Sequence, residues 1–220
     1  MKKTINYIQN IKESSISYRV QLSKNRVMSL NALQAKDISI DSEYVKLLTK
    51  WRNIHYKWFF SWVKVTHEST YGWLKQYYVP SPSDIIFFIE DKKYNKFGCM
   101  AVYNISANSC EVGRFMKGDS NAPKGGMTVA LNSMLNWIYN NLKVDTVYLE
   151  VFESNIQAIK LYQRCGFVIK KRIPLEVIEN DNTKSFQPIQ DAQDSELTAH
   201  AFALQMEHKQ QDSTIDSSHQ

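Results

Sequence analysis

Residues 111–167 read EVGRFMKGDSNAPKGGMTVALNSMLNWIYNNLKVDTVYLEVFESNIQAIKLYQRCGF, and the rest of the chain is organised around this segment. It opens with strand-forming residues at 111–117 and continues into the turn composition of residues 118–123. A helix is therefore expected to begin near Lys124. Its buried face is predicted by apolar side chains that recur every three or four residues: Met127, Ala130, Leu131, Met134, Leu135 and Ile138.

The start of this helix has the composition of an anion site. It opens on Lys124, Gly125 and Gly126, and glycines at such a place let the backbone approach a ligand closely. The first amide N–H groups of a helix have no partner within the helix, so they attract anions. Because Lys124 adds a positive charge beside them, a phosphate or pyrophosphate is the expected ligand.

A second strand and a second helix complete the unit. Residues 146–151 (TVYLEV) read as a buried strand in which Glu150 is the charged exception. Ser154 or Asn155 is expected to cap the following helix, 156–164, and a glycine stands after it where a left-handed residue ends a helix. The order strand, helix, strand, helix, strand predicts an α/β domain.

Five residues in the second half follow the pattern N-x-x-A-x-x-x-Y-x-x-x-G-F: Asn155, Ala158, Tyr162, Gly166 and Phe167. With the strand, glycine turn and helix before them, they resemble the GCN5-related N-acetyltransferase (GNAT) family. A second family pattern, R/Q-x-x-G-x-G/A, is met only in part. Gly125 matches its middle position, but Ala122 replaces the arginine or glutamine at the first position and Met127 replaces the glycine or alanine at the last. The resemblance implies an α/β GNAT fold with a mixed central sheet of about seven strands, in which an antiparallel meander precedes a β-α-β-α-β half that binds acetyl-CoA.

The resemblance also implies the cofactor-binding and catalytic residues, and no metal. Tyr162 stands where the family places the proton donor to the leaving thiolate. Glu150 is the candidate general base, acting through water, and the alternative is a wall carboxylate that orients the acceptor. The oxyanion site would be a backbone N–H near Phe115 and Met116. The acetyl-CoA-binding residues implied are Phe115, Met116, Lys117, Lys124, Gly125, Gly126, Met127, Thr128 and Asn155.

A basic and aromatic segment near residue 52 is expected to recognise the acceptor. Arg52, Asn53, the aromatic residues after them and His67 resemble the family members of the flagellar pseudaminic acid pathway, which acetylate a nucleotide-linked amino sugar. That match implies that Arg52 and His67 face the nucleotide phosphates or the sugar, and that Phe60 lines the pocket or stacks in it. A protein N-terminus is the alternative acceptor, because the same Arg-Asn pair occurs in relatives that acetylate ribosomal proteins.

The flanking segments set the expected domain boundaries. Residues 1–26 are polar and weakly patterned, so they are treated as an N-terminal extension to an acetyltransferase domain at 27–208. Residues 209–220 are expected to be a disordered tail, and residues 174–196 a long loop that closes the acceptor pocket or makes a homodimer contact. The other expected elements are helices capped by Asp41 and Thr66 and strands at 27–33, 84–90, 96–105, 108–117, 168–173 and 198–208, the last two paired.

Composition argues against several other classes of protein. The 220 residues are 43% hydrophobic and 22% charged, with no apolar run of about 20 residues and no signal-peptide core, so a cytoplasmic protein without a membrane partner is expected. The three cysteines lack metal spacing, and the net charge of +5 is spread along the chain rather than gathered for nucleic acid. A CoA-binding protein without turnover and a nucleic-acid or partner-binding module are the minor alternatives.

Overall fold

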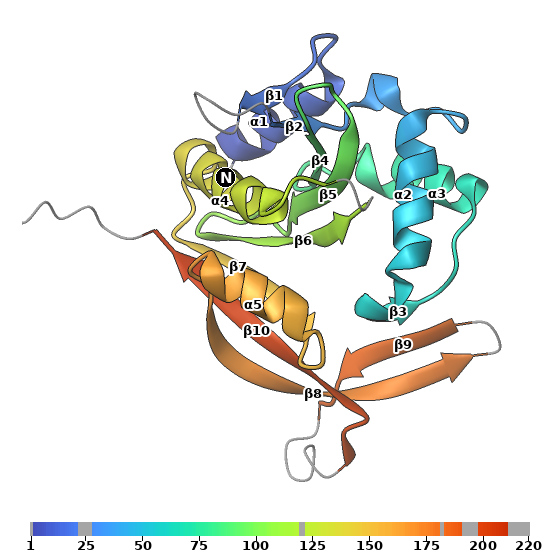
Figure 1. Ribbon diagram of the computed structural model, residues 1–220, viewed down its shortest axis with the longest axis vertical. Coiled ribbons are helices and arrows are strands. Elements are labelled where there is room, and N and C mark those ends of the chain that lie inside the picture. Colours follow the sequence, from blue (N-terminus) through green and yellow to red (C-terminus); the bar gives the residue numbers. More distant parts are fainter. Residues whose placement is uncertain (1, 22–27, 119–121, 181–182, 191–197, 211–220) are drawn as a thin grey trace, which may run out of the picture.

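The computed structural model describes residues 2–21, 28–118, 122–180, 183–190 and 198–210. Within these ranges the strands form one mixed, ten-stranded sheet in the order β1-β2-β4-β5-β6-β7-β10-β8-β9-β3 (Figure 1). The sheet is wider than the implied sheet of about seven strands because β1, β3 and β9 extend it. Of the tail expected to be disordered, residues 211–220 lie outside the described ranges.

The N-terminal half of the sheet contains the expected antiparallel meander β4-β5-β6, and β1 and β2 extend it at one edge. All six residues of β4 are buried, because helices cover both faces of the sheet there. The strands in sheet order are β1 (Arg19–Gln21), β2 (Ser29–Ala32), β4 (Ile85–Glu90), β5 (Lys96–Tyr103) and β6 (Ser109–Lys117).

The C-terminal half follows the expected order of strand, helix, strand, helix and strand, and it begins where β7 pairs parallel to β6 after the crossover helix α4. The final strand, β10, lies between β7 and β8 and is antiparallel to both. Its Ala203 pairs with Ile173 of β8, which confirms the pairing expected for that strand. The elements are α4 (Gly126–Asn141), β7 (Thr146–Phe152), α5 (Ile156–Arg164), β8 (Val168–Asn180) and β10 (Ala201–Lys209).

The expectation of a long loop at residues 174–196 is wrong for residues 174–180 and 183–188, and residues 181–182 and 191–196 lie outside the described ranges. β8 continues to Asn180, and β9 (Thr183–Pro188) returns antiparallel beside it, so the two strands form a long hairpin that projects from the body of the protein (Figure 1). The outer edge of β9 pairs with β3 (Ser61–Trp62). Leu175 and Phe186 are buried, while their charged and polar neighbours face solvent. The many polar residues in this segment made its sequence resemble that of a loop.

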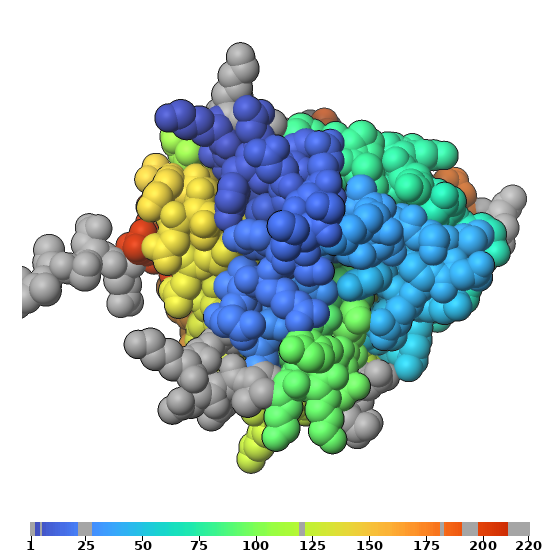
Figure 2. Space-filling model, turned by 90° about the horizontal axis from the view of Figure 1, so that it is seen from above, coloured from blue at the N-terminus to red at the C-terminus, as the bar shows by residue number. Residues whose placement is uncertain are grey.

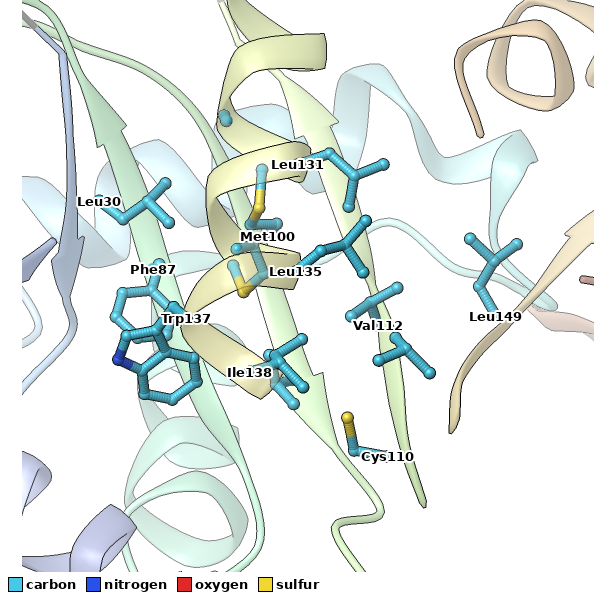
Figure 3. Close-up of a cluster of buried hydrophobic side chains, with 14 of the residues drawn as sticks. Leu30, Phe87, Met100, Cys110, Val112, Leu131, Leu135, Trp137, Ile138 and Leu149 are labelled. Carbon is cyan, nitrogen blue, oxygen red and sulfur yellow. The ribbon is translucent and has the colours of Figure 1, made fainter. Parts of the chain in front are cut away.

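Helices cover both faces of the sheet, and the N-terminal segment lies between α4 and the segment that carries α2 and α3 (Figure 2). On one face α1, α4 and α5 enclose the larger hydrophobic cluster, in which Trp137 meets Phe87 edge-on at 5.0 Å between ring centroids (Figure 3). On the other face α2 and α3 enclose a second cluster around Trp51. No helix in the described ranges is long and apolar enough to cross a bilayer. The bounds are α1 (Lys2–Glu13), α2 (Glu43–Ile54), α3 (His67–Trp73), a π-helical turn (Leu74–Tyr78) and 3-10 helices at Ala35–Asp37 and Tyr56–Trp58.

Side-chain caps fix the starts of three helices. Ser42, rather than the expected Asp41, caps α2, because its Oγ accepts a hydrogen bond from the Val45 amide at 3.3 Å. Thr66 caps α3 as expected. Of the two candidates before α5, Asn155 is the cap, and its Oδ1 accepts a hydrogen bond from the backbone amide three residues later at 3.3 Å. Local hydrogen bonds of this kind determine the residue at which each helix begins.

Residues 1–26, expected as an extension, include α1 and β1, and both pack into the domain. Ile8 and Ile11 of α1 are buried in the larger cluster, and β1 pairs with β2. Lys12 is 1% exposed and donates hydrogen bonds to the main-chain carbonyls of Tyr78 at 2.7 Å, Val79 at 3.2 Å and Ser81. Burial lowers the pKa of Lys12 to about 8. One ammonium group therefore connects α1 to the end of the π-helical turn.

Replacement of Lys12 by methionine should destabilise the protein, because three buried or part-buried carbonyls lose their donor while the side chain keeps a similar length. A hydrogen bond to a charged group contributes about 1.5–3 kcal/mol, so we expect the free energy of unfolding to fall by about 2 kcal/mol or more in urea denaturation. Lys3→Met, at an exposed position of the same helix, is the matched control. Equal stability of the two variants would show that Lys12 does not anchor α1.

Candidate active site

A gap opens in the sheet where β6 and β7 part. Their parallel pairing consists of Ser109 with Thr146, Cys110 with Val147 and Glu111 with Tyr148, although β6 continues to Lys117 and β7 to Phe152. The β5–β6 register shifts in the same region, and Arg114 there adopts a left-handed backbone conformation with φ of 48°. A bulge of this kind bends its strand, so β6 turns away from β7 and leaves one backbone edge without a strand partner.

A cleft with a volume of about 620 Å³ occupies this gap. Its walls come from β6, from the end of β7, from the exposed side of α5 and from the segment 55–60 that follows α2. The lining residues are His55, Trp58, Phe59, Phe60, Tyr103, Glu111, Val112, Gly113, Arg114, Phe115, Lys117, Met127, Glu150, Asn155, Gln157, Ala158, Lys160, Leu161, Tyr162 and Arg164. The cleft is thus lined by both halves of the domain.

Two carboxylates stand on adjacent strands in the cleft. Glu111 of β6 accepts hydrogen bonds of 2.8 Å from the Tyr103 hydroxyl and of 2.8 Å from the Asn104 side-chain amide. Burial raises the pKa of Glu111, and the negative charge of nearby Glu150 raises it further. Glu150 itself is exposed, and its Oε1 accepts a 3.4 Å hydrogen bond from Gln205 of β10. Glu111 is therefore a carboxylate held in place by two hydrogen bonds, with a pKa raised above that of an ordinary glutamate, as suits a proton acceptor.

Tyr162 brings a neutral phenol to the opposite wall of the cleft. It lies on α5 and is 8% exposed, and its ring meets Phe115 of β6 edge-on at 5.9 Å between centroids. Burial raises the pKa of Tyr162, so the hydroxyl keeps its proton. No residue in the described ranges accepts or donates a hydrogen bond at this hydroxyl. The phenol is therefore available as a proton donor to a group bound in the cleft.

The start of α4 has the geometry expected of an anion site. Gly125 precedes the helix with a left-handed φ of 73°, a conformation that favours glycine, and both Lys124 and Gly125 are exposed. The amide of Gly126 donates to the Pro123 carbonyl at 2.8 Å, which leaves the next amides, of Met127 and Thr128, at the open end of the helix. Such an end favours phosphate groups.

Four of the nine expected cofactor-binding residues line the cleft: Phe115, Lys117, Met127 and Asn155. Lys124, Gly125, Gly126 and Thr128 belong to the first turn of α4 and the residues just before it, and do not line the cleft. Met116 is 3% exposed and lines a second, largely apolar cavity behind β6, with a volume of about 390 Å³.

The three expected acceptor residues are not brought together. Phe60 lines the cleft and packs against Phe152 at 4.8 Å between centroids. Arg52 lines the second cavity instead, where its guanidinium donates to the Ser61 carbonyl at 2.5 Å and lies 3.9 Å from the Phe59 ring centroid. Burial lowers the pKa of Arg52 to about 10, which leaves it charged at neutral pH. His67 is exposed at the first residue of α3 and does not line the cleft.

Several cleft residues had no role in the sequence analysis. His55 lines the cleft with its Nε2 2.7 Å from the Lys117 carbonyl oxygen, and it lies three residues after Arg52. Glu111 and Tyr103 form the hydrogen-bonded pair described above, and Gly113 accommodates the Tyr103 ring because a Cβ there would collide with the hydroxyl. The signal available for Glu111 was an acidic residue in each of the two expected strands, 111–117 and 146–151.

Comparison with known proteins places the chain in a family. A family model described as an acetyltransferase (GNAT) domain matches residues 30–168. The acetyltransferase PseH of Campylobacter jejuni (strain 81-176) is 29% identical over 131 residues, which cover 59% of this chain and 80% of the relative. PseH of a second C. jejuni strain, NCTC 11168, matches with the same identity and coverage.

Solved structures agree on the fold. A Vibrio cholerae spermidine N-acetyltransferase in complex with CoA and spermine has a TM-score of 0.63 at 20% identity, covering 83% of this chain and 95% of that one. Crystalline C. jejuni PseH has a TM-score of 0.53 at 22% identity, covering 84% and 99%. The chain therefore belongs to the GNAT family, as the sequence resemblance implied, and is an acetyl-CoA-dependent N-acetyltransferase.

Proposed function

We propose that the enzyme transfers the acetyl group to the amine of a UDP- or dTDP-linked amino-dideoxy sugar. The charge of the cleft carries this proposal. Lys117, Lys160 and Arg164 line it, and none of them has an acidic partner within the described residues. Excess positive charge in one cleft suits two anionic substrates, acetyl-CoA and a nucleotide sugar. The resemblance at Arg52 and Asn53 and the 29% identity to acetyltransferase PseH support the same acceptor.

Acetyl-CoA lies along the gap between β6 and β7 in this proposal. The free backbone edge of β6 near Phe115 and Met116 offers amide N–H groups to the pantetheine and to the thioester oxygen. The first turn of α4, with Lys124 before it, binds the pyrophosphate through its free amides. Asn155 lies in the cleft at the start of α5, within reach of the same extended chain.

Glu111 is the general base in the proposed reaction. The acceptor ammonium must lose a proton before its nitrogen can attack, and Glu111 can take that proton directly or through one water. Hydrogen bonds from Tyr103 and Asn104 hold its carboxylate, while burial and the charge of Glu150 keep its pKa raised. Glu150 is exposed and lines the same cleft, so it orients the acceptor and is the second candidate for the base.

Tyr162 completes the reaction as the acid. The amine nitrogen bonds to the thioester carbon, and the oxygen becomes an oxyanion that backbone amides of the β6 bulge stabilise. The carbon–sulfur bond then breaks with its electron pair going to sulfur, and the Tyr162 phenol gives its proton to the thiolate. As the amide forms, the nitrogen loses its second proton, which passes through water to the phenolate oxygen and restores the Tyr162 phenol. Arg52 supports this site indirectly, because it holds the Ser61 carbonyl and thus the segment that carries Phe60.

A protein N-terminus is the runner-up acceptor. The unpaired cations of the cleft disfavour a basic peptide tail and equally disfavour a polyamine, since both would bring like charge into one low-dielectric space. The likeness to spermidine acetyltransferases is one of fold at 20% identity. The hydroxyl-rich, anionic nucleotide sugar remains the better electrostatic match to this cleft.

A thiol-release assay tests the acceptor. We expect CoA release with UDP- or dTDP-linked 4-amino-dideoxy sugars, and at least tenfold lower kcat/KM with spermidine, ribosomal N-terminal peptides or the free amino sugar. Mass spectrometry should find the acetyl group on the sugar nitrogen. If peptides or polyamines are acetylated and every nucleotide-linked amino sugar is ignored, the acceptor assignment is wrong and the membership of the family stands.

Replacement of Tyr162 by phenylalanine keeps the ring that packs against Phe115 and removes the proton. We expect kcat to fall by about a hundredfold to ten-thousandfold while the KM for acetyl-CoA stays within twofold, because general acid catalysis acts on the chemical step. Tyr77→Phe, at a 64% exposed tyrosine outside the cleft, is the control. Unchanged turnover in Tyr162→Phe across the pH range would remove this residue from the chemistry.

Replacement of Glu111 by glutamine should remove the acidic limb of the pH profile of kcat/KM. A base is active only when deprotonated, and because the pKa of Glu111 is raised, the wild-type limb should lie above the usual range of a glutamate. Glu150→Gln is the matched comparison: it removes the neighbouring negative charge, so the limb should persist and move to lower pH. If instead Glu150→Gln abolishes the limb and Glu111→Gln retains it, Glu150 is the base.

A further inference from the structure

A third cavity, with a volume of about 630 Å³, lies beside the β8–β9 hairpin and is here called the hairpin cavity. Its lining residues are Lys57, Trp58, Trp62, Phe152, Ser154, Val177, Glu179, Lys184, Phe186, His200 and Ala201. Most of them lie beyond residue 168, where the match to the family model ends. The cavity is therefore built from both sides of that limit, by the segment 57–62 and the end of β7 and by residues of β8, β9 and β10.

We propose that the hairpin cavity binds the nucleoside end of the acceptor, so that the base and ribose lie there while the amino sugar reaches the cleft. This inference rests on the proposed function, because it assigns a site to the nucleotide of that same acceptor. The supporting observations are the position of the cavity, its exposed and buried aromatic rings, its one unpaired buried donor and the arrangement of its charges.

The hairpin cavity adjoins the catalytic cleft. Trp58 lines both, and the consecutive residues Ser154 and Asn155 line one each. Phe152, in the wall of the hairpin cavity, lies two residues after Glu150 on β7, and alternate residues of a strand face the same side of the sheet. A single elongated acceptor can therefore place its amine near Glu111 and Glu150 and its other end in the hairpin cavity.

Aromatic rings give the hairpin cavity the chemistry of a base-binding site. Trp58 is 49% exposed, although most large apolar side chains of the chain are buried, and an exposed indole face is a stacking surface that accepts any planar base. Behind it Trp62 packs on Phe186 at 5.0 Å and Phe186 on Phe152 at 4.9 Å between centroids. The Trp62 Nε1–H is buried and has no acceptor among the described residues. A carbonyl oxygen of a pyrimidine base would supply that acceptor.

The charges are arranged as a nucleotide requires. Lys57 has no acidic partner within the described ranges, and it precedes Trp58, the residue that lines both cavities and past which the diphosphate would run. Elsewhere in the cavity wall the Lys184 ammonium pairs with Glu179 at 2.5 Å and lies 5.4 Å from the Trp62 ring centroid. The Glu179 carboxylate can accept hydrogen bonds from ribose hydroxyls, and His200 lines the same wall.

The cavity is preorganised by main-chain pairing. β3 pairs with β9 through Ser61 with Ser185 and Trp62 with Lys184, and the Phe186 amide donates to the Phe60 carbonyl at 2.7 Å. The hairpin and the aromatic segment are thus joined in one sheet before a ligand arrives. A site that is already ordered loses little conformational entropy on binding.

Calorimetric titration of UDP and dTDP into the enzyme tests the inference. The titration is made with saturating CoA, so that the start of α4 is occupied and the added nucleotide must find another site. We expect both nucleotides to bind, Trp58→Leu to weaken that binding at least tenfold, and Lys57→Glu to weaken UDP at least tenfold more than uridine. Tyr94→Leu, at a 63% exposed tyrosine outside this cavity, should bind as the wild type does.

Turnover separates this inference from the proposed function. If the nucleotide sugar is acetylated, Trp58→Leu and Lys57→Glu should each raise its KM at least tenfold, and Lys57→Glu, which changes a residue outside the cleft, should leave the KM for acetyl-CoA unchanged. Acetylation with an unaltered KM in both Trp58→Leu and Lys57→Glu would overturn the hairpin site and leave the function in place. Binding of UDP that depends on Trp58, without acetylation of any nucleotide sugar, would uphold the site and overturn the function. Loss of all UDP binding when CoA is present would overturn the site.

Discussion

The active site depends on one constraint, the parting of β6 from β7 after Glu111. Strand pairing lost there must be offset, and Arg114 provides the compensation at the bulge. Its guanidinium pairs with Asp84 at 2.7 Å and lies between the rings of Trp73 and Tyr103, at 4.9 Å and 4.6 Å from their centroids. These contacts hold the left-handed residue in place. The gap that results gives the cleft its backbone edge, its two carboxylates and its access to the Tyr162 phenol.

The acceptor side is held in shape by the same Arg-Asn pair that carried the sequence resemblance. Arg52 donates to the Ser61 carbonyl, while the Asn53 side chain accepts from the Val65 amide at 2.9 Å and donates to its carbonyl at 2.8 Å. Ser61 and Trp62, which form β3 in this segment, also pair with β9. Two residues that suggest ligand recognition in the sequence therefore serve first as clamps on the loop that presents Trp58 and Phe60.

Local signals were the predictable part of the fold and of the site. The bounds of α5 could be read because its cap, Asn155, and the left-handed Gly166 after it act within a few residues. The β8–β9 hairpin could not be predicted from the sequence, because the sequence of β9 is polar and its strand conformation depends on pairing with β8 and β3. The role of Glu111 as a candidate base was missed for the same reason, because its raised pKa depends on burial and on the charge of Glu150, a residue of another strand. Non-local pairing is what a single sequence shows least.

The position of β10 in the sheet affects how the protein can fold during its synthesis. β7 and β8 follow one another along the chain, separated by α5, but they are not neighbours, because β10 lies between them and pairs with both. As the ribosome extends the chain from its N-terminus, β7 and β8 emerge before the strand that joins them. Until residues 201–209 have left the exit tunnel, the nascent domain carries an open slot flanked by two unsatisfied edges, which is the state most exposed to chaperones and to mispairing.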